Sequence, residues 1–525
     1  MGFWANTGLG WMIGLTLLGI DVGTTGVRAL LFDPSSRRCH IADRSYELFL
    51  PEPGRAEQDP DQIWEATKSA TAEVLRTADG TQTVSLSISS QGGTLIPLDE
   101  KFKPRGNAIV WMDHRAKAQA DALTSEFGKE FFYKKTGWPL TGCLPFLQIR
   151  WLKEERPELF RRISRFAFVG DYMTYKLSGM WVADPSSASI TMLYNLKDGT
   201  WDEELLKMAG IREDQLPQLA DSGRLIGAVK PSVARKIGFR GREMLVSTGG
   251  HDQYCASLGA GALEDGDLLL SGGTAWVLLL TSGVALFDAR SFLSPGRHVM
   301  KGLWGLMGSI SGAGAGVRWL AGLLRGKKSP GGEESRLYRS IEREGMGLPP
   351  GSEQLFFYPH FLGATAPTWE ADAKGAIVGL GLHHRPAHVF RALLEGIGFE
   401  VLWNVETFRS LGAKVSSVSM IGGAARSLIW PRIISNILDM PVRIPRIKEA
   451  ACVGAAVLGG LGAGTIKDYR EGIDAFLSGS SVVNPDPEDS RRYRELSARY
   501  RSGFWRLRDV WSSSTRPRSS QNALR

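Results

Sequence analysis

Cysteine is rare in this sequence, with 4 among 525 residues. The four residues are far apart and form no Cys-x-x-Cys pair: Cys39, Cys143, Cys255 and Cys452. Zinc sites, redox motifs and disulfide frameworks all use closely spaced or regularly paired cysteines. The spacing therefore argues against a zinc site and a disulfide-stabilised fold, and it favours a reducing, cytoplasmic location.

The chain also lacks a long basic run, an RNP motif and zinc-finger spacing. Its 63 Lys and Arg exceed its 55 Asp and Glu, for a formal net charge of +8, but they are spread along the sequence. Nucleic acid is therefore a poor candidate partner. A basic balance also suits an anionic substrate such as a nucleotide.

Charged side chains are absent from residues 1–20. Length alone would allow a membrane anchor or a signal there, but the segment lacks a basic start, contains several glycines, and runs directly into a motif described below. We expect residues 15–20 to form a buried strand, residues 1–11 to be a tail, and Met12 to be a candidate start. Residues 509–525 are polar without periodicity and are expected to be a disordered tail.

The length predicts two or more domains. Residues 15–33 read as a strand, a Gly/Thr turn and a second strand, and residues 266–283 repeat this design. We therefore expect two α/β domains of related architecture, over residues 12–250 and 251–508. Other predicted elements are helices at 63–77, 146–163, 386–411 and 450–464, and strands at 84–90 and from 415 into a Gly-rich turn at 422–427.

The turn at Gly23-Thr24-Thr25-Gly26 offers backbone N–H groups and two hydroxyls, and Asp21 stands just before it. Backbone N–H groups can hold phosphate, and a carboxylate beside phosphate suits Mg²⁺. The second copy, Ser271-Gly272-Gly273-Thr274, strengthens this interpretation. Neither turn is a Walker P-loop, because no GxxxxGK[ST] occurs. The Gly-rich turn at 422–427 could place backbone against a flat nucleoside.

The chain resembles the FGGY carbohydrate kinases over roughly residues 13–505. The motifs that carry the resemblance occur in the family's order: "GIDVGTTGVRALLFD", "EQDPDQIW", "AIVWMDHRA", "GGHDQ", "SGGTA", "YPHFLGATAPTWEADAKGAIVGL", "ALLEGIGFE" and "MIGGAARSLIWPRI". The resemblance implies two actin-like (ribonuclease H-like) ATPase domains with a cleft between them. It also implies transfer of the ATP γ-phosphate to a sugar or polyol hydroxyl, with Mg²⁺, and a homodimer is common in the family.

The resemblance also implies roles for individual residues. Asp252 would be the general base and Asp21 the second catalytic acid, with both as candidate Mg²⁺ ligands. ATP would contact Thr24, Thr25, Gly26, Gly273, Thr274, Gly314, Arg318, Gly422, Gly423, Ala424 and Ser427. The substrate would contact Gln91, Gly92, Gly93, Asp113, Asp252 and Gln253.

Several of these residues have ordinary structural alternatives. Asp252 could cap a helix, and Asp113 could simply pair with Arg115. We expect His251 to be structural rather than a substrate contact, and Glu395 to make a structural hydrogen bond. Among the tryptophans, Trp111 and Trp276 are the candidates for lining the cleft.

Some positions depart from the family. Gly92 and Gly93 replace Arg-Glu of glycerol kinase and Met-His of xylulokinase, and we expect them to leave extra room for the acceptor. Gln148 stands where Lys is usual, which should affect only local packing, and "LGATAP" lacks the usual Arg, which could alter a loop near the nucleotide.

The sequence therefore predicts a kinase for a sugar, with a ketopentose such as xylulose as the first acceptor. Two alternatives stay open at this point. One is a polyol kinase of the glycerol or erythritol type, and the other is a non-catalytic ATP-binding regulatory protein on the same fold.

Overall fold

The computed structural model describes residues 15–77, 83–288, 290, 293–325 and 333–512. Within them the chain forms an α/β fold around two seven-stranded sheets, which agrees with the expected fold class. The expected tail at 1–11 lies outside the described residues. Helix α17, Pro487–Ser512, extends past residue 508, so residues 509–512 are helical and not part of a tail.

The N-terminal sheet contains the first predicted strand–turn–strand unit. β1 (Leu15–Val22) pairs antiparallel with β2 (Gly26–Asp33) and parallel with β5 (Thr83–Ser90). On the other side of β5 lie β14 (Glu243–Ser247) and the short β15 (Gly250–His251). β3 (Arg38–Ser45) and β13 (Leu225–Ala228) form the two edges.

The second sheet repeats this arrangement. β16 (Asp267–Gly272) pairs antiparallel with β17 (Trp276–Ser282) and parallel with β22 (Ser417–Gly422). The sheet is completed by β18 (Ser294–Arg297), β19 (Trp304–Ile310), β23 (Val442–Ile444) and β24 (Ser481–Val483). In both sheets a Gly-rich turn follows the carboxyl end of a central strand, so the predicted relation between the halves is confirmed.

Prolines set the ends of several helices, because proline fits the first turn but lacks the N–H that a helix interior needs. α1 (Pro60–Leu75) and α13 (Pro386–Ser410) both begin at a proline, close to the predicted bounds. The single helix expected over 146–163 is wrong. Pro157 ends it, leaving α4 (Pro145–Glu155) and the short α5 (Pro157–Phe160).

The remaining described helices and strands cover the sheets and build the connections. The helices are α2 (Lys117–Phe127), α3 (Lys129–Thr136), α6 (Val169–Ser178), α7 (Pro185–Ser189), α8 (Glu203–Ala209), α9 (Pro231–Lys236), α10 (Asp252–Gly259), α11 (Ala313–Arg325), α12 (Glu333–Met346), α14 (Trp430–Leu438), α15 (Ala450–Gly462) and α16 (Tyr469–Leu477). The short strands are β4 (Glu57–Gln58), β6 (Leu95–Leu98), β7 (Ala108–Ile109), β8 (Arg165–Phe168), β9 (Val182–Ala183), β10 (Tyr194–Asn195), β11 (Thr200–Trp201), β12 (Gln218–Leu219), β20 (Phe356–Tyr358) and β21 (Ala376–Val378).

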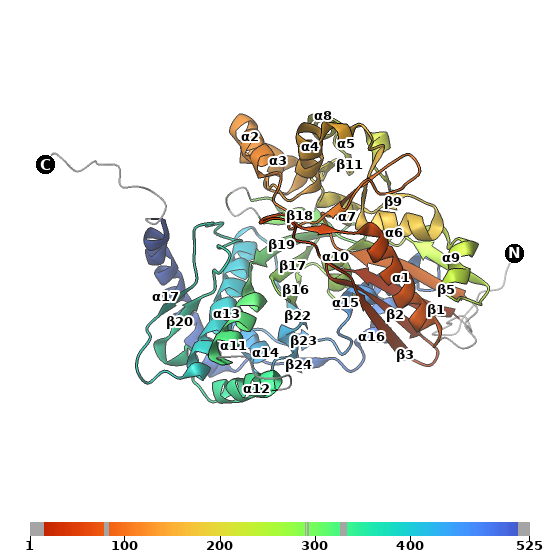
Figure 1. Cartoon of the computed structure of the whole chain (residues 1–525). Helices are drawn as coiled ribbons and strands as arrows, with labels where there is room; N and C mark the ends of the chain where they lie inside the picture. The colour runs from red at the N-terminus through yellow and green to blue at the C-terminus, as the bar shows by residue number, and fades with distance from the viewer. Residues whose placement is uncertain (1–14, 78–82, 289, 291–292, 326–332, 513–525) are drawn as a thin grey trace, which may run out of the picture.

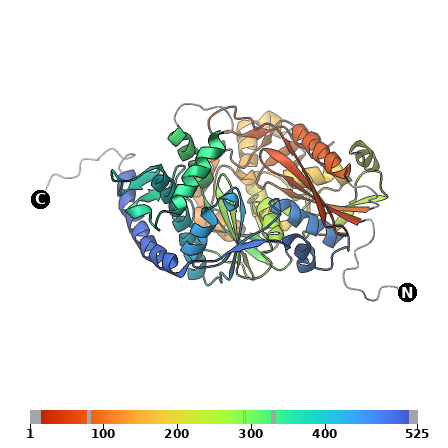
Figure 2. The same cartoon turned by 90° about the horizontal axis from the view of Figure 1, so that it is seen from below.

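The two halves meet through α10 and α15, which lie between the sheets (Figure 1). A Cβ on Gly454 of α15 would lie 1.9 Å from the carbonyl oxygen of Cys255 in α10, and one on Gly19 of β1 would lie 1.8 Å from the carbonyl oxygen of Cys452. Glycine is therefore required at both positions. The helix predicted at 450–464 is confirmed as α15, and these contacts show that it packs closely on both neighbours. Figure 2 shows the two halves side by side from below.

Candidate active site

The two predicted catalytic acids come together through the register of the N-terminal sheet. Asp21 of β1 and Gly250 of β15 are both partners of Ser89 in β5, one on each side. Asp252 follows two residues after Gly250, at the start of α10. Ser89 Oγ donates a hydrogen bond of 2.8 Å to Asp21 Oδ1.

Burial raises the pKa of each of the two carboxyls. Burial, together with the negative charge of Asp252, raises the pKa of Asp21 to about 7. Burial likewise raises the pKa of Asp252 to about 7, although hydrogen bonds with Gln253 oppose the shift. The side chain of Asp252 keeps 26% of its surface exposed, so it is enclosed by protein yet reachable. Two carboxyls in one site whose pKa values both lie near 7 are typical of acid–base chemistry.

Asp252 does not cap its helix. It occupies the first helical position, the N-cap is His251, and no side chain caps the helix. Instead, Asp252 Oδ1 lies 3.1 Å from His251 Nε2. Burial lowers the pKa of His251 to about 4, so the imidazole is neutral.

The first Gly/Thr turn is closed by a bond from Gly23 N–H to the carbonyl oxygen of Gly26, 3.0 Å long. Trp111 Nε1 donates to Thr24 Oγ1 at 2.9 Å, whereas Thr25 is exposed. Gln58 donates to the carbonyl oxygen of Thr24, and Gln91 Nε2 donates to Gln58 Oε1 at 2.8 Å. The turn is thus connected to Gln91, a predicted substrate residue.

The second turn brings together four of the residues predicted for ATP. Arg318 Nη2 donates to Thr274 Oγ1 at 3.1 Å, and the N–H of Ala315 donates to the carbonyl oxygen of Thr274 at 3.1 Å. A Cβ on Gly314 would lie 2.0 Å from the carbonyl oxygen of Gly273. The start of α11 therefore rests directly on this turn.

The third turn lies beside the second. Gly272 and Gly422 are partners across β16 and β22, and Ala424 Cβ would meet a Cβ on Gly272 at 2.5 Å. Gly423 is exposed. Ser427 Oγ donates to Glu342 of α12 and accepts from Trp430 N–H at 3.0 Å, so this hydroxyl holds α12 and α14. An ATP contact by the Ser427 side chain stays a prediction.

The extra room expected at Gly92 does not exist. A Cβ on Gly92 would lie 2.7 Å from both Cδ2 and Nε2 of His251 and 2.9 Å from Ile190 Cγ2. Gly93 has φ +72°, and its Cβ would meet Trp111 Cβ at 3.3 Å. Neighbouring side chains, chiefly His251, therefore fill the space that a side chain at position 92 would take.

Gln253, the residue after Asp252, carries a polar side-chain atom without a hydrogen-bond partner among the described residues. This atom is Oε1, and it is buried. A buried acceptor without a partner costs free energy. Gln253 therefore fits the predicted role of binding a hydroxyl.

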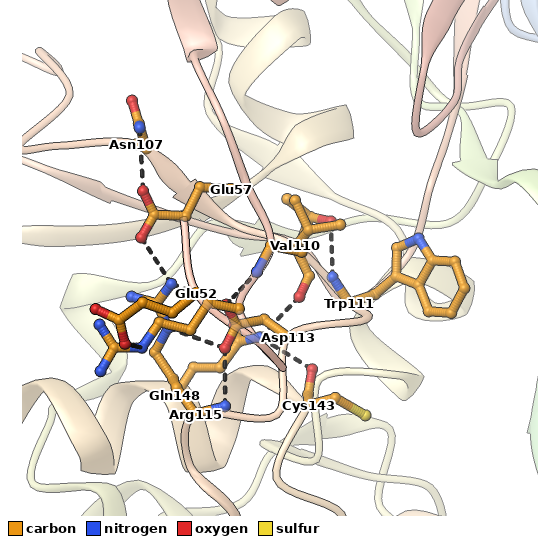
Figure 3. A network of polar contacts seen from close by, with 12 residues as sticks. Glu52, Glu57, Asn107, Val110, Trp111, Asp113, Arg115, Cys143 and Gln148 are labelled. Carbon is orange, nitrogen blue, oxygen red and sulfur yellow. Dashed lines mark hydrogen bonds and ion pairs between the residues drawn. The ribbon is translucent and has the colours of Figure 1, made fainter. Parts of the chain in front are cut away.

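The carboxylate of Asp113 is already bound by other residues of the chain (Figure 3). It is fully buried, and its carboxylate accepts from the N–H of Ala56 at 2.7 Å and from the N–H and guanidinium of Arg115. Arg115 Nη2 also donates to Glu57 Oε1 at 2.7 Å. The geometry favours the ion pair with Arg115 over substrate contact. The ring of Trp111 points away from this network, and 39% of the residue is exposed.

Three other expectations concern packing. Gln148 Nε2 donates to the carbonyl oxygens of Val110 and Cys143, so its effect is local, as expected. Glu395 is structural, as expected, because it accepts from Ser352, Arg391 and Tyr493. Trp276 does not line a cleft, because it is fully buried with its ring 4.8 Å from that of Trp430.

Sequence reasoning missed two residues of the site, Ser89 and Gln58. Gln58 stands inside a quoted motif, "EQDPDQIW", and that was the available signal. Ser89 belongs to "SISS", where only the pairing of β5 with β1 selects one serine out of three.

A second group of possible metal ligands among the described residues consists of Glu353, His383 and His384. His384 Nδ1 accepts from Gly381 N–H at 2.8 Å, and His388 Nδ1 accepts from Arg385 N–H at 3.1 Å. Their Nε2 atoms therefore carry hydrogen. Metal binding needs a free lone pair, and His384 Nε2 lies 3.3 Å from the carbonyl oxygen of Glu353, so these contacts argue against His384 as a metal ligand.

Comparison with known proteins assigns both halves of the chain. Residues 16–259 match the N-terminal domain of the FGGY family of carbohydrate kinases, and residues 268–463 match its C-terminal domain. The chain is 28% identical over 491 residues to a gluconokinase of Bacillus licheniformis, covering 91% of this chain and 94% of the relative. It is 34% identical over 467 residues to a glycerol kinase of Thermus brockianus, covering 86% and 90%.

Its fold is similar to that of the ligand-bound xylulose kinase from Lactobacillus acidophilus, with a TM-score of 0.86 and 25% identity, covering 95% of this chain and 100% of that one. The two family domains, in order, cover the central strands of both sheets and the helix α10 that carries Asp252. The chain therefore belongs to the FGGY family of carbohydrate kinases, phosphotransferases that use ATP with Mg²⁺ and act on an alcohol group.

Proposed function

We propose that this kinase transfers the γ-phosphate of ATP to a hydroxyl of a ketopentose such as xylulose, with Asp252 as the general base. The observation that carries the proposal is the pairing of Asp21 and Asp252 in one site, each with its pKa raised to about 7 by burial. A general base works best when its pKa lies near the working pH.

In the proposed step the Asp252 carboxylate takes the proton of the acceptor hydroxyl. The acceptor oxygen then forms a bond to the γ-phosphorus, and the bond from that phosphorus to the bridging oxygen of ADP breaks. Asp21, with Asp252 beside it, would hold Mg²⁺, which when bound neutralises phosphate charge. Two adjacent carboxylates are a suitable donor set for that ion.

The ATP side of the proposal rests on backbone that only glycine allows. A Cβ at Gly314 or Gly422 would collide with the carbonyl oxygen of Gly273 or Gly272, so the backbones in this region can approach closely. We assign the phosphates to Thr24, Thr25, Gly26, Gly273, Thr274 and Arg318. The nucleoside is assigned to Gly314, Gly422, Gly423, Ala424 and Ser427.

The acceptor side favours a neutral molecule. The side chains beside Gly92 and Gly93 belong to His251, Ile190, Leu144 and Trp111, and none of them carries a positive charge, since His251 is neutral. Gluconate, the substrate named for one relative, would bring a carboxylate. Gln253 Oε1 can accept a hydrogen bond from a hydroxyl, which suits a ketose or a polyol.

A polyol of the glycerol or erythritol type is the second candidate acceptor, and the 34% identity to a glycerol kinase favours it. The non-catalytic alternative is set aside, because the chain belongs to a family of kinases. We further propose a cytoplasmic location, supported by the lack of paired cysteines. Among the described residues, no helix is both long and apolar enough to cross a bilayer. A homodimer stays a prediction.

A coupled ADP-release assay over xylulose, ribulose, gluconate, glycerol and erythritol tests the proposal. We expect the highest kcat/KM with a ketopentose. In Asp252→Asn we expect kcat to fall by at least about 1,000-fold. ATP binding by Asp252→Asn, measured by calorimetry, should stay near that of the wild type. Full turnover in this variant would contradict the assignment of Asp252 as the base. A preference for gluconate would contradict the proposal of an uncharged acceptor.

A further inference from the structure

The backbone of His251 is fixed from two sides. In β15 it is the partner of Ser90, and its N–H donates to Ser186 Oγ at 3.0 Å. Ser186 is itself held, because its own N–H donates to Asp184 Oδ2 at 2.8 Å, where Asp184 caps α7. The peptide that precedes Asp252 therefore has one position.

The ring of His251 is fixed as well. The side chain is 6% exposed, and the ring centroid lies 5.5 Å from that of Tyr254. Its Cδ2 and Nε2 atoms occupy the space over Gly92, where a Cβ would come within 2.7 Å of both. Any larger residue at position 92 would displace the ring.

The short contact between His251 Nε2 and Asp252 Oδ1, 3.1 Å, bears on which ring nitrogen carries the proton. An ionised carboxylate can only accept hydrogen bonds, so a hydrogen bond across this contact requires the ring nitrogen to be the donor. That nitrogen is Nε2. The other ring nitrogen, Nδ1, has no partner among the described residues.

We infer that His251 is a positioning residue for the base. Its Nε2–H donates to Asp252 Oδ1 and stops the carboxylate from rotating about the Cβ–Cγ bond, so that the acceptor hydroxyl meets an oxygen in a constant direction. Gly92 is the other half of this arrangement, because its missing side chain makes room for the ring. The inference rests on the proposed function, in which Asp252 is the base.

The arrangement also bears on how the proposed acceptor is recognised. Residue 92 contributes no side chain to acceptor recognition, and the imidazole of His251 occupies the space that such a side chain would take. The same ring therefore orients the base and limits the volume open to the acceptor. Displacing a catalytic group by about 1 Å can lower the reaction rate about 100-fold.

Two substitutions at His251 separate positioning from simple packing. The amide nitrogen of Gln reaches about as far as Nε2, whereas that of Asn stops near the place of Nδ1. With an acceptor that the wild type phosphorylates, we expect His251→Gln to stay within about 5-fold of the wild-type kcat and His251→Asn to lose about 10- to 100-fold, with the KM for ATP unchanged in both. Equal losses in the two variants, or no loss in His251→Asn, would overturn the inference.

The pairing with Gly92 is tested by a double-mutant cycle. Gly92→Ala should lower kcat about as much as His251→Asn, and adding Gly92→Ala to His251→Asn should cost little more, because the ring is already gone. Gly322→Ala is the matched control, since a Cβ there meets nothing within 4 Å, and it should leave kcat unchanged. Fully additive losses in the cycle would contradict the pairing.

A measurement without turnover keeps this inference distinct from the proposed function. The chain has 8 histidines, so nitrogen-labelled histidine gives a short set of imidazole signals, and His251→Gln identifies the one of interest. We expect an Nε2–H tautomer whose signal shifts in Asp252→Ala. An Nδ1–H tautomer, or no shift, would refute the hydrogen bond. If this spectrum is as expected but no acceptor is phosphorylated, the proposed function fails and the positioning role fails with it.

Discussion

Gly272 and Gly422 are register partners in the parallel pair of β16 and β22, and a Cβ on Gly422 would lie 2.7 Å from the carbonyl oxygen of Gly272. This contact joins the turn at 271–274 to the turn at 422–427. Two segments far apart in the sequence thereby form one continuous surface of backbone.

The first prediction concerns Gly422→Ala. Gly422 has φ +83°, which strains any L side chain, and the added Cβ would collide with backbone. We expect the KM for ATP to rise by about 10-fold or more, because the two turns must move apart. Gly412→Ala is the control: Gly412 has φ +84° with nothing within 4 Å, so it carries the strain without the collision. Equal effects on KM would contradict the contact between the turns.

The second prediction concerns the acid on β1. Asp21→Asn removes a proposed Mg²⁺ ligand, and we expect kcat to fall by about 100-fold or more at any Mg²⁺ concentration. Ser89→Ala removes the hydrogen bond that lowers the pKa of Asp21. Its carboxyl should then be more protonated near neutral pH, so the variant should need more Mg²⁺, and the difference should shrink as the pH rises. A Mg²⁺ requirement identical to that of the wild type would contradict this coupling.

The third prediction concerns stability in acid. Burial lowers the pKa of His298 to about 3 in the folded chain. Because the folded state holds this imidazole neutral, the group's contribution to stability is complete above its unfolded pKa of about 6.5 and declines as the pH falls toward about 3.

His298→Asn tests this window. Met300 N–H donates to His298 Nδ1 at 3.1 Å, and an Asn side-chain oxygen can accept in nearly the same place. Thermal unfolding midpoints at about pH 7.5 and about pH 5 should differ less in the variant than in the wild type. The same change in unfolding midpoint between the two pH values in both proteins would show that His298 does not contribute to the loss of stability in acid.

The fourth prediction concerns the buried pair of Arg391 and Glu395, joined by a bond of 2.8 Å. Glu395→Gln leaves the guanidinium buried beside a neutral amide, and we expect the free energy of unfolding to fall by about 3 kcal/mol. The exposed pair of Arg492 and Glu488, also one helical turn apart, is the control, and Glu488→Gln should cost about 0.5 kcal/mol or less. Denaturant titration measures both. Comparable losses would contradict the structural role of Glu395.

Local patterns predicted much of the fold. Alternation of apolar strands with Gly/Thr turns predicted both strand–turn–strand units, and the ends of α13 follow from Pro386 and the apolar spacing after it. The error over 146–163 came from one residue, because Pro157 interrupts an otherwise regular apolar pattern.

The site was predicted less completely. Glycines in turns can be read from the sequence, but what they leave room for cannot: at Gly92 the space is filled by His251, a residue from another part of the chain. Asp113 and Trp276 are likewise residue types that occur in binding sites. Only the tertiary structure shows that Asp113 is paired with Arg115 and that Trp276 is buried against Trp430.

The sequence alone determined the fold class, the two related halves and the chemical types gathered in the turns, because these depend on patterns within a few residues of one another. Tertiary structure alone decided which acid lies beside which, which nitrogen of His251 faces Asp252, and which polar groups are already satisfied. Those relations depend on strand register and on packing across the two halves, where side chains distant in sequence compete for the same space.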